Sequence, residues 1–203
     1  MSSLGDRFNQ FTGRKRFVVC RLMLHLAGAE VAPILGVLNQ AGRNSINADG
    51  DLHVLGENLV DVCQTLLNNE VYWQAAANEG DVFWKEEEAG DYINELFTDS
   101  AQRYLAETSY EGAGSIDSAN PNLTLPVTRH IVVMIAIACE GEVPDLETDL
   151  AQLDAMGRGL KTIVNLHYKN SLRAIQVHFS PARLGDELTS EQVLLNFPEL
   201  VPL

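Results

Sequence analysis

Positive charge is scarce in this sequence. Its 203 residues include 14 Lys and Arg against 28 Asp and Glu, which gives a net charge of −14. Nucleic acids and anionic membrane surfaces are bound through concentrated positive charge, so this composition disfavours both as partners. A basic protein partner fits the charge better, although a high net charge also simply keeps a protein dissolved.

Cysteine is equally scarce. Cys20, Cys63 and Cys139 are far apart in the sequence and show neither a disulfide framework nor a zinc-site spacing. We interpret all three as reduced, buried, small hydrophobic residues of an intracellular protein. A reactive thiol is the alternative, and the only cation fixed beside any of them is Arg21.

Long hydrophobic runs are missing as well. The first 17 residues contain no apolar core of signal-peptide length, and no stretch is long enough to cross a bilayer as a helix. We therefore expect a cytoplasmic protein with no integral membrane segment.

Recognisable catalytic and ligand motifs are also lacking. There is no nucleophile elbow, phosphate loop or dinucleotide fingerprint, and the five histidines share no ligand spacing. Asn47, Asp49 and Asp51 resemble the start of a calcium loop, but Leu52 stands where that loop needs glycine and Asn58 where it needs glutamate. The sequence thus predicts no catalytic residue, no cofactor and no metal.

Three apolar stretches predict strands. Ile131 to Cys139 is an unbroken apolar run rich in β-branched residues, which is typical of a strand buried on both faces. Phe17 to Leu26 and Arg173 to Phe179 alternate with period two. The first indicates a strand with one well-buried face, and the second suits an edge strand or a strand with one solvated side. Helical crossovers between them favour at least one parallel pair.

Helical periodicity accounts for most of the remaining chain. We expect helices near 31–38, over 55–69, over about 82–105, over about 146–156 and after Thr189, where Gln192 completes a capping box. The sequence therefore predicts an α+β protein, with a small mixed sheet of about three strands and amphipathic helices packed mainly on one face. Residues 1–16 form a mobile N-terminal arm and 17–203 a single domain with a long loop at 108–128.

Two groups of residues are candidates for a partner surface. The first combines aromatic anchors with acidic neighbours, a combination common in interfaces and equally common in ordinary helix packing. The second is a small basic patch at the end of the arm. The candidate residues are Tyr72, Trp73, Trp84, Glu86, Glu87, Glu88, Arg14, Lys15 and Arg16.

The order of the segments resembles a known family. The stretches FVVCRLMLHLAGAE, WKEEEAGDYINELF, HIVVMIAIACEG, RAIQVHFSPA and GDELTSEQVLLNFPELVPL follow one another between residues 17 and 203. They are similar to the domain-of-unknown-function family fifteen-seventeen of cyanobacteria and chloroplasts, which includes the plant fluctuating-light-acclimation protein. Many relatives carry a glycine-rich linker and a membrane segment before this domain, and this sequence has neither. The resemblance implies a photosynthetic organism and a regulatory role near the thylakoid, and it supplies no catalytic residues.

These observations lead to two functional hypotheses. The first is a non-catalytic regulatory or adaptor protein that acts through protein–protein contacts, with peripheral thylakoid association through a partner. The alternative is an enzyme or small-molecule binder with a pocket near the strand ends, using His130 or His178. His25 lies on another predicted strand, and whether these three histidines converge is left open, although separate half-exposed histidines are favoured. A homo-oligomer that buries its edge strand is a third arrangement.

Overall fold

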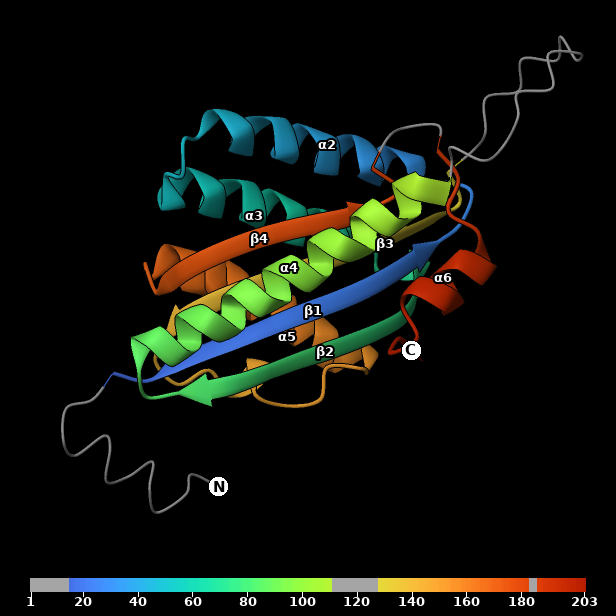
Figure 1. Ribbon diagram of the computed structural model, residues 1–203. Coiled ribbons are helices and arrows are strands. Elements are labelled where there is room, and N and C mark those ends of the chain that lie inside the picture. The colour runs from blue at the N-terminus through green and yellow to red at the C-terminus, as the bar shows by residue number, and fades with distance from the viewer. Residues whose placement is uncertain (1–14, 111–127, 183–185) are drawn as a thin grey trace, which may run out of the picture.

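The computed structural model describes residues 15–110, 128–182 and 186–203. The predicted arm, apart from Lys15 and Arg16, and most of the predicted loop at 108–128 lie outside these residues. Within them, five strands form one sheet in the order β4-β3-β1-β2-β5. Figure 1 labels β1 to β4 of this sheet. The strands are β1 (Phe17–Ala27), β2 (Trp73–Phe83), β3 (His130–Glu140), β4 (Leu172–Ser180) and β5 (Val201–Pro202). The α+β class is confirmed, whereas the expected number of about three strands is too low.

The two predicted apolar strands form the centre of the sheet. β1 pairs with β3 along its whole length, from Phe17 opposite Glu140 to Ala27 opposite His130. Nearly every residue of both strands is buried. Both faces of these strands are therefore covered, as the unbroken apolar run of β3 predicts.

Every strand pair is antiparallel, so the predicted parallel pair is wrong. The physical reason lies in the order of the strands. Helix α4 (Glu86–Tyr110) does connect two strands of the same direction, β2 and β3. β1 lies between these two strands and pairs with both, so no parallel ladder forms.

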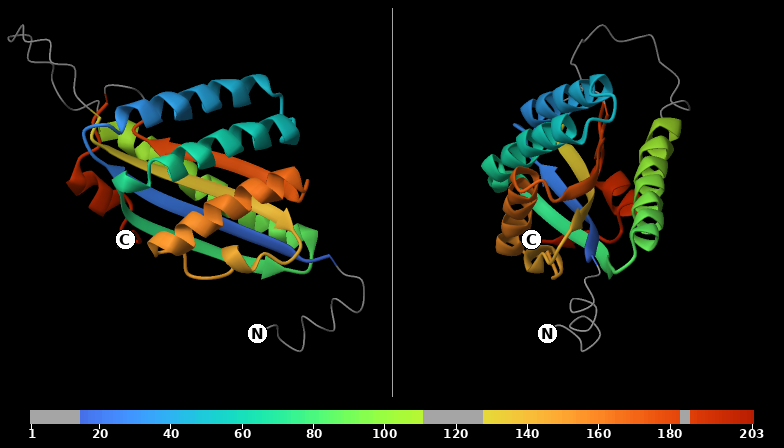
Figure 2. Two further views of the ribbon diagram at one scale, coloured as in Figure 1. Left: turned by 180° about the vertical axis from the view of Figure 1, so that it is seen from behind. Right: turned by 90° about the vertical axis from the view of Figure 1, so that its left-hand side faces the viewer.

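Helices cover both faces of the sheet, which corrects the expectation that they pack mainly on one. Figure 2 shows α2 (Ala32–Asn47), α3 (Leu52–Asn68) and α5 (Leu153–Tyr168) on one face, and α4 with α6 (Ser190–Asn196) on the other. The larger apolar core lies under α2, α3 and α5. Two smaller clusters lie under α4 and under α6.

Three helices differ from their predicted bounds. α4 begins at Glu86 rather than near residue 82, because residues 82 and 83 belong to β2. α2 begins with Pro33 in its first turn, as expected, but continues to Asn47 through residues expected to form a loop. α5 begins at Leu153 and passes through Gly157 and Gly159, which were expected to end a helix. A Cβ at Gly159 would lie 3.1 Å from Leu150 Cδ1, so this glycine lets the preceding linker pack closely against α5.

The C-terminal helix is capped as the sequence predicts. The Thr189 hydroxyl accepts a hydrogen bond from the backbone N–H of Gln192, and the Gln192 side chain accepts one from the N–H of Thr189. Leu188 and Val193 are buried together in one cluster, so the hydrophobic contact across the cap also forms. No helix among the described residues is long and apolar enough to cross a membrane.

Candidate functional site

The aromatic candidates do not form one surface. Trp73 is only 6% exposed, and its indole N–H donates to the Leu66 carbonyl at 3.1 Å, so it is a core residue. Tyr72 packs against Gly28, where a Cβ would lie 2.8 Å from the tyrosine ring. Trp84 is half-buried and follows the other end of β2. An 11-residue strand therefore separates Tyr72 from Trp84.

The acidic candidates lie on the surface at the start of α4. Glu86, Glu87 and Glu88 are exposed and occupy its first turn. Acidic side chains at this end of a helix interact favourably with the unpaired N–H groups of that turn. Helix stabilisation therefore accounts for their position without a partner.

The basic candidates that the structure describes are tied to the fold. Lys15 contacts the Glu140 carboxylate at 3.3 Å. The Arg16 guanidinium binds both carboxylate oxygens of Glu147, at 2.7 and 2.5 Å. These two side chains fasten the start of β1 to β3 and to the linker before α5, and Arg14 lies outside the described residues.

Two of the three strand histidines meet. His25 Nε2 lies 3.0 Å from His130 Nδ1, and the rings stack with centroids 5.2 Å apart. Burial, with a smaller contribution from His130, lowers the pKa of His25 to about 4. Burial also lowers the pKa of His130, and the Ser190 hydroxyl lies 3.2 Å from His130 Nε2. The neutral His25 ring can accept the Nδ1 proton of His130, which leaves Nε2 free to accept from Ser190.

His178 occupies a different place. It pairs with Met134 on β3, whereas His25 pairs with Val132, two positions earlier in the same strand. Burial and then the nearby Arg21 lower the pKa of His178. The structure thus joins His25 to His130 and places His178 in the surroundings of Arg21.

The three cysteines are free and buried. Burial raises the pKa of Cys63 to about 12 and is the main cause of a rise to about 12 at Cys139. Burial likewise raises the pKa of Cys20. A thiol with such a pKa carries almost no thiolate at neutral pH. The expectation that the three cysteines are buried is confirmed.

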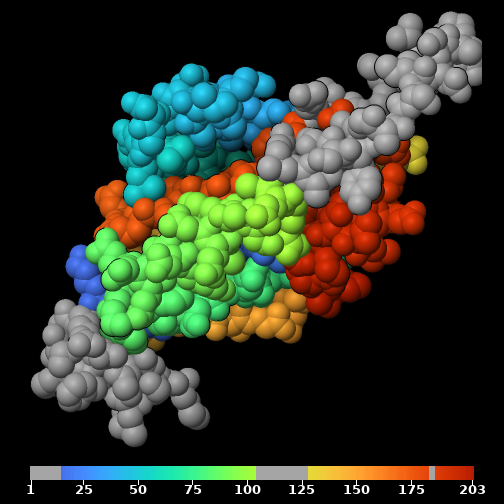
Figure 3. All heavy atoms as spheres, viewed as in Figure 1, coloured from blue at the N-terminus to red at the C-terminus, as the bar shows by residue number. Residues whose placement is uncertain are grey.

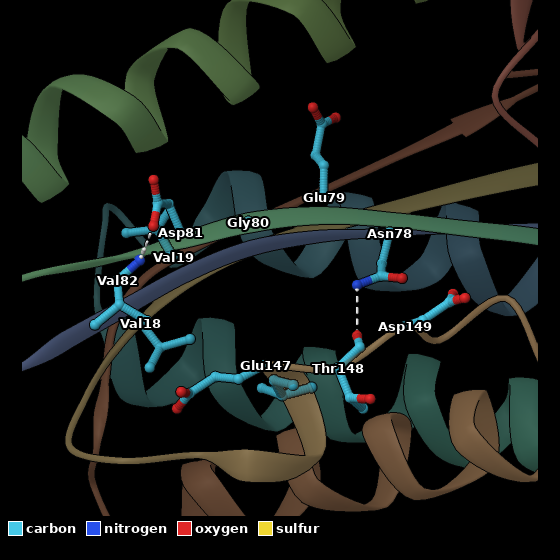
Figure 4. A pocket seen from close by; sticks show the side chains of 11 residues that line it. Val18, Val19, Asn78, Glu79, Gly80, Asp81, Val82, Glu147, Thr148 and Asp149 are labelled. Atoms are coloured by element: carbon cyan, nitrogen blue, oxygen red, sulfur yellow. Dashed lines mark hydrogen bonds between the residues drawn. The ribbon is translucent and has the colours of Figure 1, made fainter. Parts of the chain in front are cut away.

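An open acidic recess of about 450 Å³ lies beside the C-terminal half of β2 (Figure 4). The Asn78 side chain donates to the Thr148 carbonyl and accepts from the N–H of Leu150, which holds the linker before α5 at its rim. The carboxylates do not converge, because Glu79 points toward α4 while Glu147 lies on the opposite side of the sheet. Among the described residues, no group of three His, Cys, Asp or Glu side chains could hold a metal ion.

A second hollow lies between β4 and two helices, and sequence reasoning missed it. Its volume is about 250 Å³, and none of its lining residues is charged. Figure 3 shows this hollow between the cyan helices and the orange strand β4, with green α4 on the other side of the strand. The lining residues are Leu38, Ala41, Gly42 and Ser45 of α2, Leu55, Asn58, Leu59 and Val62 of α3, and Ile175, Gln176, Val177 and Phe179 of β4.

The β4 side of this hollow is an edge strand. β4 is the last strand of the sheet, and no described segment pairs with its outer side. Ile175, Val177 and Phe179 face the large core and are only partly buried. Alternation in the sequence predicted this edge strand and its apolar side, but not the helices that would flank it. The hollow and the outer side of β4, together called the β4 groove below, form the best-defined apolar site among the described residues.

A comparison with protein-family models shows one match. The model described as "Protein of unknown function (DUF1517)" matches residues 16–203. No curated protein and no solved structure matches the chain.

Proposed function

The chain belongs to this family of proteins of unknown function, DUF1517, and we propose that it is a non-catalytic adaptor or regulatory protein that binds a segment of another protein in the β4 groove. The proposal includes the photosynthetic setting that the sequence resemblance implies. In that setting the protein would work in the cyanobacterial cytosol or at the thylakoid surface, through a bound partner.

The observation that carries the proposal is the combination of an unpaired strand edge with an uncharged apolar hollow beside it. An unpaired edge presents backbone N–H and C=O groups that can bond to another chain. The hollow supplies apolar surface that becomes buried only when something fills it. A bound segment would therefore gain backbone hydrogen bonds from the strand edge and apolar burial from the hollow.

The size of the hollow favours side chains over a whole small molecule. Sites for drug-sized ligands measure about 300–1,000 Å³. The hollow measures about 250 Å³ and lies on the open side of a strand. A protein segment that places two or three aliphatic side chains into it fits this space better.

The test is selection of short peptides by the full chain with a matched pair of variants. Val177→Lys places a charge at the hollow, whereas Leu195→Lys makes the same kind of change at a site on α6 that is 69% exposed. We expect a displayed library of random peptides to enrich sequences that bind the wild-type chain and Leu195→Lys but not Val177→Lys. Circular dichroism must show that both variants are folded. Enrichment that is equal for all three proteins would overturn the proposal.

A second candidate function rests on the Ser190–His130–His25 contacts. A serine bonded to a neutral histidine that is oriented by a third group is the arrangement of an activated nucleophile. The alternative function is therefore that of an enzyme whose site lies near the strand ends. A fluorophosphonate probe that labels Ser190 in the wild-type chain but not in His130→Ala would support it, and absence of labelling would remove it.

A further inference from the structure

We propose that the partner enters the β4 groove as an extended segment that pairs with the outer edge of β4 and becomes a sixth strand of the sheet. This inference rests on the proposed function and specifies how the site binds.

Within the described residues, the edge of β4 lacks the features that usually prevent strand pairing. Natural edge strands are protected by proline, by lysine or other inward charges, by bulges, or by a covering segment. Ala174 to Phe179 contains no proline and no Lys, Arg, Asp or Glu. The irregularity in the β3–β4 ladder lies before this stretch, between Ala138 and Cys139 on β3. Six consecutive residues of the strand are thus regular, and no segment that the structure describes covers their outer edge.

Helix α2 lies beyond the β4 edge of the sheet, where a further strand would be covered by it. α3 packs on β4, whereas α2 packs on α3 and is the outermost helix of that face (Figures 1 and 2). Its Leu38, Ala41 and Ser45 line the hollow together with β4. The helical layer is therefore wider than the sheet on this side, and the space under α2 is where the next strand would lie.

The geometry of a strand then fixes the chemistry of the partner. Alternate side chains of an added strand point to opposite faces, so every second residue would enter the hollow under α2. Because the lining carries no charge, those residues should be aliphatic or small. Because the chain has a net charge of −14, basic residues at the ends of the segment would favour association.

The position of α2 beyond the edge of the sheet also argues against a second copy of this chain as the partner that binds in the β4 groove. Two copies joined through their β4 edges would each bring an α2 helix that extends past its own edge. Those helices would compete for the space beside the new strand pair. A single extended segment needs only the width of one strand, about 4.8 Å.

The experiment uses the peptide most enriched by the wild-type chain over Val177→Lys, labelled with fluorescein and measured by anisotropy. In an extended peptide the N–H groups of alternate residues point to opposite edges. Two derivatives are therefore made, one N-methylated at the odd residues and one at the even residues. Strand pairing predicts that one derivative loses about tenfold or more in affinity, while the other changes by less than about threefold.

The outcomes separate this inference from the proposed function. If both derivatives bind equally, the groove is used but strand pairing is wrong. If no peptide is enriched, the proposed function fails and the inference fails with it. A dimer in sedimentation that Val177→Lys dissociates would make a second copy the occupant and would overturn the inference.

Discussion

Replacing Gly80 by alanine tests how closely β2 lies against the central strand. A Cβ at this position would lie 2.5 Å from the Val19 carbonyl oxygen and 2.9 Å from Cys20 Cβ. Gly80 pairs with Cys20 in the β1–β2 ladder, so the obstructing atoms belong to a strand buried in the core. They cannot move aside without disturbing the pairing on both sides of β1.

The expected cost follows from this crowding. Forcing one extra carbon into a packed region costs about 1–3 kcal/mol. Gly90 provides the matched control, because it lies inside α4 and a Cβ there meets nothing within 4 Å. Gly90→Ala should stabilise the protein by about 0.5–1 kcal/mol, since alanine loses less conformational freedom in a helix.

Urea unfolding followed by circular dichroism measures both variants. Their free energies of unfolding should differ by about 1.5–4 kcal/mol, with Gly80→Ala the less stable. Each kcal/mol corresponds to about 2–4 °C in melting temperature for a chain of this length. Equal stability of the two variants would show that the β1–β2 ladder has room for a side chain at Gly80, contrary to the close approach of these strands.

Three further predictions concern the cap, the core tryptophan and the histidine pair. Thr189→Ala should lower the free energy of unfolding by about 1 kcal/mol, because the N–H of Gln192 loses its acceptor, and unchanged urea unfolding would contradict this. Trp73→Phe should cost about 1–3 kcal/mol in the same assay, because the Leu66 carbonyl loses its indole donor, whereas a surface tryptophan would cost nothing. The folded state binds a proton at His25 only near pH 4, while the unfolded state does so near pH 6.5, so stability should fall as pH drops from 6.5 to 4. His25→Leu should make that decline shallower in unfolding curves measured across this range, and an unchanged slope would contradict the assignment.

The sequence predicted the elements whose own side chains decide their structure. β3 is apolar enough to be buried on both faces, and β1 and β4 alternate clearly. The alternation of β1 predicted only one well-buried face, whereas α4 and α6 bury its second face as well. β2 was missed because its sequence, WQAAANEGDVF, joins small and polar residues without apolar alternation. Its strand conformation comes from pairing with β1 along the full length, which no local pattern reveals.

The candidate site was less predictable than the fold. Aromatic and charged residues drew attention to Tyr72, Trp73 and Trp84, which the fold separates by burial and by the length of β2. The β4 groove depends on α2 continuing to Asn47 and lying beyond the sheet. That placement results from the packing of α2 on α3, and no local pattern of residues signals it.

The position of β1 has a consequence for how the chain is made. β1 is synthesised before the other strands of the described sheet, yet Phe17 pairs with Phe83 on one side and with Glu140 on the other. At about 5–20 residues per second, some 6–25 s pass between synthesis of β1 and synthesis of its partner in β3. During that interval β2 is the only sheet partner of β1 that has been synthesised, so the edge of β1 that later pairs with β3 stays open. Chaperone capture of the nascent chain should therefore concentrate on β1 and end once β3 has emerged.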